Sequence, residues 1–328
     1  MRALVTGGNG FVGSWLVRAL LSEGHQVRAM TRPTSDTSRL EGLGCEIGHG
    51  DMLDPASLPP LLEGIDAVFH CAAALGKSSQ DDFDAVNVGG TGHLVQAILQ
   101  VRPDLERFVL VSSAAAGGPS TSERKRTEDD APAPISLYGR SKLAGERALA
   151  PLHDASVPVT ILRPPAVYGP GGAVMAPLFR GVQRGLQLEI GGPRRPMSFV
   201  HVKDLARGTV LAATHERGAG EIFHVIGPTD GTFGEFQQAI ARALERRVLR
   251  LKVPPAVMKV AGWGADRYKA AFGGHTSFGS DKVRDGLAPS WAVSGAKARD
   301  VLGFVPTIGF DEGVRDTIED FRARGWLA

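Results

Sequence analysis

The segment "TGGNGFVG" (6–13) decides the fold, because its glycines lie between a strand pattern and a helix pattern. The apolar run "RALVT" (2–6) before it is typical of a buried strand, and "FVGSWLVRALLSEG" (11–24) after it is typical of a helix. Glycine permits a tight turn there, and the free N–H groups at the helix start attract phosphate. We therefore predict a dinucleotide pyrophosphate site at Gly7, Gly10, Phe11, Val12 and Gly13.

Strand and helix patterns alternate through the first half of the chain. Further strands are predicted at 26–32, 45–51, 66–73, 107–113 and 158–164, with helices at 55–64, 81–100 and 136–150. Helices of this length between strands indicate right-handed crossovers and a parallel sheet. The sequence thus predicts an α/β protein, a doubly wound parallel Rossmann sheet with a smaller C-terminal substrate lobe.

The second half of the chain loses this alternation, and short strand patterns are separated by Gly/Pro-rich turns. We expect residues 1–165 to form the dinucleotide-binding core and 166–328 to form mainly the substrate lobe, with some segments returning to the core. The polar stretch 117–134 is predicted to be a mobile surface loop, and its length favours a functional flap. The amphipathic stretch 253–274 either packs in the core or lines a hydrophobic pocket.

The composition excludes several classes of protein. Hydrophobic residues make up 43% and charged residues 22% of the 328 positions, which excludes a mostly disordered chain. A net charge of +2 gives no reason to expect a nucleic-acid or anionic-membrane partner. Cys45 and Cys71 are expected to be reduced and buried, and no His/Cys/Asp cluster has metal-ligand spacing. The chain opens with "MRALVTGG", without an apolar leader or a membrane span, so we expect a cytoplasmic protein.

The end of the second strand selects the cofactor. It reads "MTRPTSDTSR" (30–39), and it places Arg32, followed by Arg39, where NAD sites have a carboxylate for the ribose. Because a guanidinium suits a 2′-phosphate, NADP(H) is favoured and NAD(H) is possible. In "GDMLD" (50–54), Asp51 could accept from the adenine amino group while Met52 packs on its ring.

Two further motifs predict a catalytic site. "VSSAA" (111–115) ends the fifth strand, where parallel sheets bind ligands, and a serine there can donate to a substrate oxygen. "YGRSK" (138–142) sets Tyr138 and Lys142 four residues apart, so that their side chains can meet on one helix face. The pattern suggests a proton donor and the cation that tunes it.

The motifs, in their order along the chain, resemble the extended short-chain dehydrogenase/reductases of the NAD-dependent epimerase/dehydratase group. They are "TGGNGFVG", "GDMLD", "VFHCAA", "NVGGT", "VSSAA", "YGRSK", "LRPPAVYGP" and "FVHVKDLA", and they cover about two thirds of the chain. Dihydroflavonol reductase-like and 3β-hydroxysteroid dehydrogenase-like enzymes, with hopanoid-associated sugar epimerases, are the nearest subgroups. The resemblance implies that Tyr138 is the general acid/base, Lys142 its tuner and Ser113 the orienting donor.

Simple physical chemistry supports these roles. A free phenol titrates near 10, and a neighbouring ammonium and nicotinium charge would lower the pKa of Tyr138 toward neutrality. The Ser113 position is preferred to Ser112 because strand side chains alternate, so that only one of the two faces the cleft.

The resemblance also implies less specific positions. Asn87 either lies beside the cofactor or bridges helix and sheet. Other cofactor contacts are expected from Cys71, Ala72, Ala73, Ser112, Pro164, Ala166 and Val167, and substrate contacts from Ala114, Tyr168, Met175 and Met197.

The substrate is predicted to be apolar or aromatic. Nucleotide-sugar enzymes of this group usually carry Arg-Asp where this chain has Met197-Ser198, although Arg194 and Arg195 lie nearby. We therefore expect an NADPH-dependent carbonyl reductase. A sugar-nucleotide epimerase or dehydratase, and a non-catalytic dinucleotide-binding scaffold, are the alternatives. A homodimer through helices 81–100 and 136–150 is possible, although their leucines must also cover the sheet.

Overall fold

The computed structural model describes residues 1–77, 79–190, 195–272 and 279–328, and it confirms the predicted fold class. A seven-stranded sheet has the order β11-β6-β5-β4-β1-β2-β3, and every neighbouring pair is parallel. The strands are β1 (Arg2–Thr6), β2 (Gln26–Thr31), β3 (Glu46–His49), β4 (Ala67–His70), β5 (Arg107–Val111), β6 (Val159–Leu162) and β11 (Ile222–Phe223).

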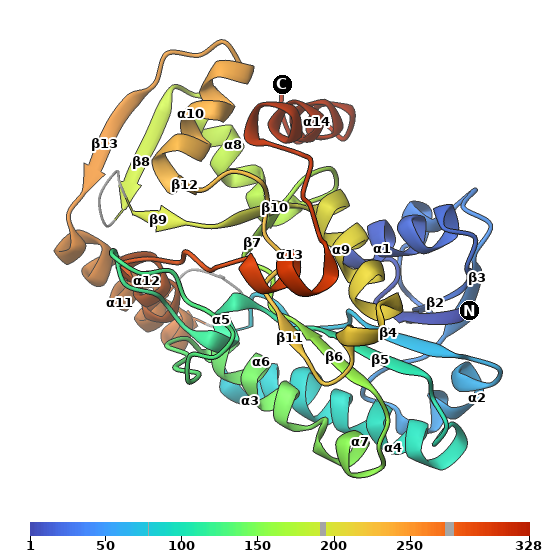
Figure 1. The fold of residues 1–328 in the computed structure, drawn as a ribbon. Helices are drawn as coiled ribbons and strands as arrows, with labels where there is room; N and C mark the ends of the chain where they lie inside the picture. Colours follow the sequence, from blue (N-terminus) through green and yellow to red (C-terminus); the bar gives the residue numbers. More distant parts are fainter. Residues whose placement is uncertain (78, 191–194, 273–278) are drawn as a thin grey trace.

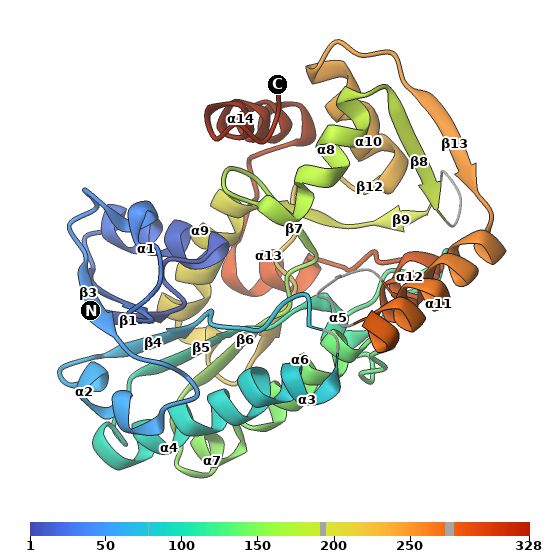
Figure 2. The same cartoon turned by 180° about the vertical axis from the view of Figure 1, so that it is seen from behind.

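Helices cover both faces of this sheet (Figures 1 and 2). One layer contains α1 (Phe11–Ser22), α9 (Val202–Thr214) and α13 (Ala296–Leu302); the other contains α2 (Pro59–Leu62), α4 (Thr91–Val101), α6 (Leu137–Arg147) and α7 (Ala150–Asp154). In β1, Ala3 and Val5 belong to the first hydrophobic layer, whereas Leu4 belongs to the second. This burial on both sides explains the continuous apolar run of the first strand.

The strand order reverses between β1 and β4, which places a crevice beyond the carboxyl ends of the central strands. The loops that follow β1, β4 and β5 carry the glycine turn and the predicted catalytic serine. The sheet topology therefore brings the cofactor motif and the catalytic motif to one edge.

The predicted helix 81–100 is interrupted. It consists of α3 (Gln80–Asp84), a π-helical turn η3 (Ala85–Gly90) and α4. α6 approaches this turn so closely that a Cβ on Gly145 would lie 2.4 Å from the carbonyl oxygen of Asn87. The prediction 136–150 similarly divides into α6 and α7.

The C-terminal lobe encloses a separate aromatic core between α8 (Ala176–Gln183), α10 (Phe233–Ala243) and α14 (Phe310–Ala323). Phe199 and Phe236 stack in this core with ring centroids 4.4 Å apart. Three two-stranded sheets complete the lobe: β7 (Ala166–Tyr168) with β10 (Phe199–His201), β9 (Pro196–Met197) with β12 (Gly231–Thr232), and β8 (Leu186–Ile190) with β13 (Leu249–Val253). From the same half of the chain, β11 forms one edge of the large sheet, and α9 and α13 lie against it (Figure 1).

The segment 117–134 is a largely irregular surface segment, as predicted, and hydrogen bonds attach it to the C-terminal part of the chain. The Ser120 hydroxyl donates to the Ser290 hydroxyl at 2.7 Å. The Arg126 backbone N–H donates to the carbonyl of Ala292 at 3.0 Å, and its carbonyl accepts from Ser294 at 2.8 Å. These partners are distant in sequence, so the local composition could not reveal them.

Candidate active site

The glycine turn forms the floor of a cavity of about 490 Å³ beyond the carboxyl ends of β1, β2 and β4. Gly7 has a φ of +66°, which favours glycine, and its carbonyl accepts from the Gly10 N–H at 2.9 Å. α1 then begins without a side-chain cap and without an acidic residue in its first turn. Its N–H groups and positive dipole end are therefore available to an anion.

The glycine turn has no room for side chains, and a backbone without side chains lets a dinucleotide come close to its N–H groups. A Cβ on Gly13 would lie 2.2 Å from the Gly7 carbonyl oxygen, and a Cβ on Gly7 would lie 2.9 Å from the Cα of Ala72. The backbone of strand, turn and helix is thus compact enough for close approach by a pyrophosphate. The spacing Gly-x-x-Gly-x-x-Gly is suited to this contact.

Most of the predicted cofactor residues line this cavity. They are Gly7, Gly10, Phe11, Val12, Gly13, Arg32, Asp51, Met52, Cys71, Ala72 and Ala73. The sequence analysis missed Asn9, Met30, Thr31, Ser35, Gly50, Leu53, Ala74, Leu75, Lys77 and Val86, although several lie within or beside the same motifs. Asp51 accepts from the Leu53 N–H at 2.9 Å, which orients its carboxylate at the cavity edge.

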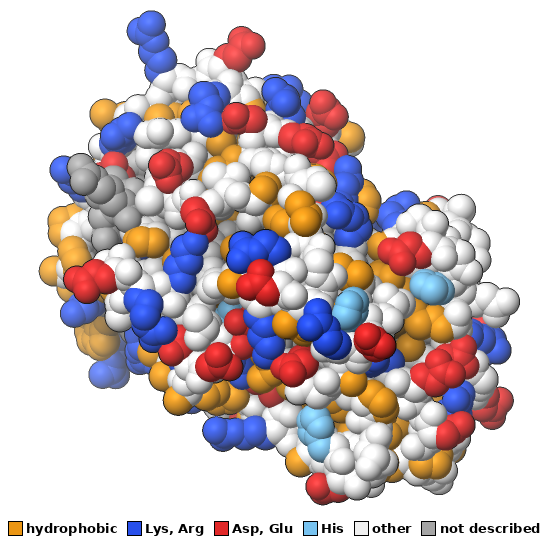
Figure 3. Space-filling view, viewed as in Figure 1, with side chains coloured by type: hydrophobic (Ala, Val, Ile, Leu, Met, Phe, Trp, Pro, Cys, Tyr) orange, Lys and Arg blue, Asp and Glu red, His pale blue; other side chains and the backbone are white. Residues whose placement is uncertain are grey.

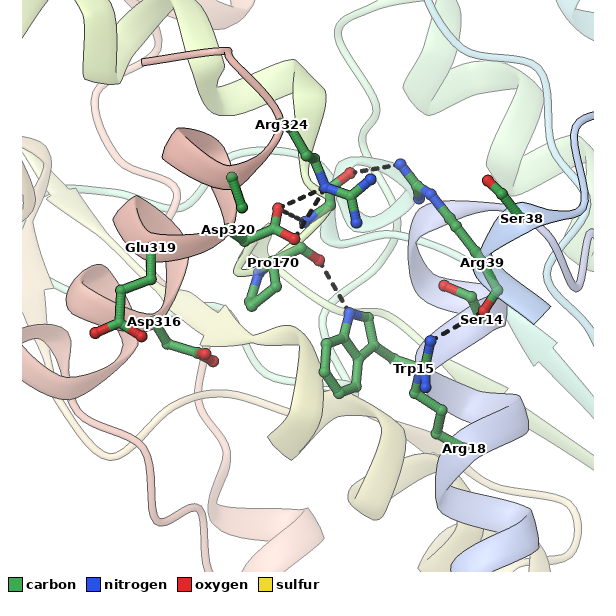
Figure 4. Close-up of a pocket in the computed structure, with 12 residues that line it drawn as sticks. Ser14, Trp15, Arg18, Ser38, Arg39, Pro170, Asp316, Glu319, Asp320 and Arg324 are labelled. Atoms are coloured by element: carbon green, nitrogen blue, oxygen red, sulfur yellow. Dashed lines mark hydrogen bonds and ion pairs between the residues drawn. The ribbon is translucent and has the colours of Figure 1, made fainter. Parts of the chain in front are cut away.

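The two arginines after β2 lie apart. Arg32 is exposed and lines the cofactor cavity with Thr31 and Ser35. Figure 4 shows Arg39 in a separate cavity of about 660 Å³ between α1 and α14, where it donates to the Gly171 carbonyl at 3.1 Å. Burial, and then the charge of Arg324, lower the pKa of Arg39. This placement leaves Arg32 as the candidate for a 2′-phosphate and gives Arg39 a structural contact.

The catalytic candidates converge beyond β5. Ser113 and Tyr138 line one cavity, where the Ser113 side chain is close enough to the phenol to lower its pKa. The Lys142 ammonium, one helical turn from Tyr138, donates to the Val111 carbonyl at 2.9 Å. Ser113 caps α5 (Ala114–Gly117), and Ser136 caps α6, so both reactive side chains stand at helix starts.

Burial controls the protonation of this site. It raises the pKa of Tyr138 to about 12, and the Ser113 hydrogen bond opposes that rise. Burial lowers the pKa of Lys142 to about 8, against the charges of Glu146 and Cys71. The pKa of Tyr138 therefore differs in direction from the sequence prediction, because in the protein alone the loss of solvation outweighs the favourable hydrogen bond.

A buried ion pair anchors α6, the helix that carries Tyr138 and Lys142. Glu146 accepts from Arg163 at 2.9 and 2.6 Å, and both side chains are nearly inaccessible. The Ser112 hydroxyl donates to the same carboxylate at 2.5 Å. Ser112 thus joins this network rather than the cofactor cavity, as alternation along the strand requires, while Ser113 faces the cleft.

The cavity at Tyr138 has a volume of about 320 Å³ and a largely apolar wall. Its predicted members are Ser113, Ala114, Tyr138, Pro164, Ala166 and Met197, and its unpredicted members include Ala115, Pro165, Arg195, Lys282, Asp285, Gly286 and Trp291. Pro164 and Ala166 were assigned to the cofactor but line this substrate side. The C-terminal residues carry no motif, so only the tertiary fold could bring them here.

Besides Arg39, Ser112 and Lys142, four predicted residues line neither cavity. Tyr168 is 1% exposed in the aromatic core, 5.2 Å from His201 by ring centroids, and Met175 packs against the same core. Val167 packs against the sheet layer. Asn87 accepts from the Ala74 N–H at 2.8 Å and donates to Ser141 at 2.9 Å, so it bridges the β4 loop and α6. The substrate roles of Tyr168 and Met175 are therefore not supported, because packing occupies both side chains.

Within the described part of the chain, no group of three or more His, Cys, Asp or Glu side chains could hold a metal ion. Cys45 and Cys71 are free thiols, and both are partly buried. No described helix is long and apolar enough to cross a membrane.

Comparison with known proteins agrees with this geometry. The model of the "NAD dependent epimerase/dehydratase family" matches residues 3–227. A "ceramide reductase" of Caulobacter vibrioides is 29% identical over 98% of this chain and 95% of its own length. A "3 beta-hydroxysteroid dehydrogenase/Delta 5-->4-isomerase" of Mycobacterium tuberculosis is 31% identical over 93% of this chain and 86% of its own.

A solved structure shares the whole fold. The UDP-glucose 4-epimerase of Thermus thermophilus, in complex with NAD, superposes with a TM-score of 0.78 at 26% identity. The match covers 98% of this chain and 99% of that one.

Proposed function

The chain belongs to the NAD dependent epimerase/dehydratase family, and from this premise we propose that it is an NADP(H)-dependent reductase of an apolar carbonyl compound. Members of the family are NAD(P)-dependent dehydrogenases, reductases and epimerases, and this chain is an enzyme of that kind. The proposal concerns the cofactor preference, the direction and the substrate class.

The proposed substrate class rests on the apolar lining of the cavity at Tyr138. The cavity that holds Ser113 and Tyr138 is otherwise walled largely by Ala, Pro, Met and Trp side chains. An apolar wall with a few convergent polar groups favours a ligand that has one polar reacting group on an apolar body. Two relatives named for ceramide and steroid chemistry are consistent with this class.

The residues divide the reaction between them. The dinucleotide, when bound along the glycine turn, supplies the hydride. Ser113 and Tyr138 hold the carbonyl oxygen, and Tyr138 gives its proton to that oxygen as negative charge develops there. Lys142 follows Tyr138 by one helical turn of α6, and in this proposal its positive charge favours the phenolate that remains. Ser113 reaches the phenol as well as the cleft, so it can orient both.

Arg32 supports the preference for NADP(H). It is the basic side chain at the carboxyl end of β2 that lines the cofactor cavity, next to the Thr31 and Ser35 positions. A guanidinium and neighbouring polar groups suit a phosphate monoester better than a ribose diol.

A sugar-nucleotide epimerase is the second candidate, because Arg195 lies on the wall of the reaction cavity and the Thermus thermophilus relative is named as a UDP-glucose 4-epimerase. The Arg195 guanidinium, however, already donates to the carbonyls of Gly286 and Ala288. Ser198 likewise bonds to Val293 in both directions. Arg194 lies outside the described residues. The contacts of Arg195 and Ser198 favour a structural role for the region that would meet a diphosphate.

The test is net cofactor consumption. Purified enzyme should oxidise NADPH stoichiometrically with a panel of apolar ketones and leave UDP-sugars unchanged. Conversion of a UDP-sugar without net NADPH consumption would establish the epimerase instead. Tight cofactor binding without turnover of either panel would favour a scaffold.

The cofactor preference is tested separately with Arg32→Ser. We expect the ratio of kcat/KM for NADPH over NADH to fall by about 10- to 100-fold, since one charge-assisted phosphate contact is lost. Arg184→Ser is the matched control, because Arg184 is exposed at the end of α8. An unchanged ratio in Arg32→Ser would remove Arg32 from this role.

A cytoplasmic homodimer remains a prediction. Leu94, Ile98 and Leu149 are fully buried in the layer that covers the sheet. A dimer through α4 and α6 would therefore use other, more polar side chains of these helices, and sedimentation analysis would show whether it forms.

A further inference from the structure

Helix α11 (Pro255–Phe272) presents large apolar side chains to solvent. Val257 is 55% exposed, Val260 68%, Trp263 60% and Tyr268 59%. The opposite side of α11 packs on α12 (Ser280–Leu287), where a Cβ on Gly262 would lie 2.8 Å from Val283. The part of the stretch 253–274 whose side chains the structure describes, 253–268, is thus neither wholly core nor wholly pocket lining, which differs from both interpretations of its sequence.

The neighbouring β8–β13 sheet continues this surface. Its register places Leu186 beside Leu249 and Leu188 beside Leu251. All four leucines are between 38% and 64% exposed, whereas Gln187 and Glu189 between them are buried. In β8 the polar residues therefore face inward and the leucines outward, which inverts the usual pattern of a sheet on a helical layer, whereas in β13 residues 249–252 are all exposed. In Figure 3, hydrophobic side chains gather along the edge of the molecule where β13 and α11 lie.

The same stretch is basic. Arg250, Lys252, Lys259 and Arg267 are all exposed, against the single carboxylate of Asp266 in residues 249–268. Arg250 and Lys252 alternate with the leucines of β13 and project from the other face of the strand, so Lys259 and Arg267 are the charges that adjoin the apolar side chains of α11. Asp266 accepts from the Ser280 N–H at 3.0 Å, toward α12. The net charge of +2 for the whole chain therefore conceals a local excess of positive charge. Arg267 lies 5.5 Å over the Trp263 ring, so charge and apolar surface are interleaved.

Exposed apolar side chains beside positive charges indicate one kind of binding partner. A helix with Trp and aliphatic residues on one face, flanked by Lys and Arg, binds the interface of an anionic bilayer. A second copy of the chain, docked by a two-fold axis, would oppose this basic stretch with itself, and like charges across an interface are unfavourable.

We propose that α11 together with the outer face of β8–β13, here named the apolar basic surface, docks on an anionic lipid membrane. The contact is peripheral, because no described helix could cross the bilayer. The proposal goes beyond the proposed reaction and does not depend on it.

The position of α12 gives this surface a connection to the reaction site. One side of α12 contributes Val283, Arg284 and Leu287 to a cavity that Lys259 of α11 also lines. The other side contributes Lys282, Asp285 and Gly286 to the cavity at Tyr138. A single helix therefore separates the docked surface from the site of reaction, which suits a substrate drawn from the lipid phase.

The test measures binding of the full chain to sedimented vesicles of phosphatidylcholine alone and of phosphatidylcholine with about 30% phosphatidylglycerol. We expect at least about tenfold stronger partition to the anionic vesicles, weakened by about 0.5 M salt. The double variant Val260→Ser with Trp263→Ser should lose at least about tenfold of this binding. The double variant Lys259→Glu with Arg267→Glu should lose the preference for anionic lipid.

Matched variants elsewhere control for hydrophobicity and charge. Val174→Ser removes an 80% exposed apolar side chain, and Arg184→Glu with Arg322→Glu reverses two exposed charges on α8 and α14. These controls should bind vesicles as the parent does, and all variants should keep the parent's circular dichroism and NADPH affinity. Absence of vesicle binding, equal loss in the controls, or a dimer abolished by Trp263→Ser would overturn the proposal.

Discussion

Gly13→Ala is the sharpest test of whether the glycine turn binds the cofactor, because the structure shows which atoms the added methyl group would contact. Its Cβ would lie 2.2 Å from the Gly7 carbonyl oxygen, 2.9 Å from the Gly7 carbonyl carbon and 3.1 Å from the Cα of Gly8. All three atoms belong to the backbone, so no side chain can rotate away. The turn must shift by about 1 Å to restore an ordinary contact distance.

A shift of this size displaces the N–H groups that start α1 from a bound pyrophosphate. Losing two charge-assisted hydrogen bonds, each worth about 1.5–3 kcal/mol, weakens binding by about 3–6 kcal/mol. The Kd for NADPH should therefore rise by about 10²- to 10³-fold or more, with a loss of about 1–3 kcal/mol in the free energy of unfolding from overpacking.

The assay is calorimetric titration with NADPH beside urea denaturation. Gly92→Ala is the matched control, since a Cβ there meets nothing within 4 Å inside helix α4. It should leave NADPH binding unchanged and stabilise the fold slightly through helix propensity. A Gly13→Ala protein whose Kd for NADPH stays within about threefold of the parent's would refute the proposal that the glycine turn binds the pyrophosphate.

Two further predictions concern buried charges. Lys142 has its pKa lowered by burial to about 8, so between pH 8 and its ordinary 10.5 the unfolded chain binds the extra proton and stability rises with pH. Lys142→Met should remove up to about 3 kcal/mol of that rise in urea melts at about pH 7 and about pH 10.5, and parallel pH profiles of the two proteins would contradict this. Glu146→Gln leaves the Arg163 guanidinium buried with a neutral partner and should lower the free energy of unfolding by about 3–5 kcal/mol. A urea-melt loss below about 1 kcal/mol would mean that the pair contributes little.

Local patterns predicted the alternating strands and helices of the first half of the chain well. Strand, glycine turn and helix follow one another within a short segment, so periodicity and glycine placement determine that unit without distant contacts. The alternation of side chains at the end of β5 correctly predicted that Ser113 and Ser112 point to different sides. The Ser112 hydroxyl donates to Glu146, whereas Ser113 lines the cavity at Tyr138.

The sequence predictions failed where contacts between distant segments of the chain determine the structure. The π-helical turn at Asn87 exists where α6 passes with Gly145, far along the chain. Tyr168 lies within the motif "LRPPAVYGP" and was predicted to contact substrate, yet the aromatic side chains of α10 and α14 enclose it. Trp291 and Asp285 reach the reaction cavity from a part of the chain that carries no recognisable motif.

Electrostatics of the site also depend on burial that no sequence shows. The short spacing of Tyr138 and Lys142 suggested an acidified phenol, whereas burial raises the pKa of Tyr138 in the protein alone. The lowered pKa of Lys142 has the same origin.

Turnover of Tyr138→Phe is the most direct test of the catalytic assignment. The substitution removes only the phenol hydroxyl, which lines the same cavity as Ser113, and it leaves the glycine turn untouched. We expect kcat for carbonyl reduction to fall by about 10²- to 10⁴-fold, with the Kd for NADPH unchanged within about twofold. A variant that keeps near-normal turnover would contradict the assignment of residue 138 as the proton donor.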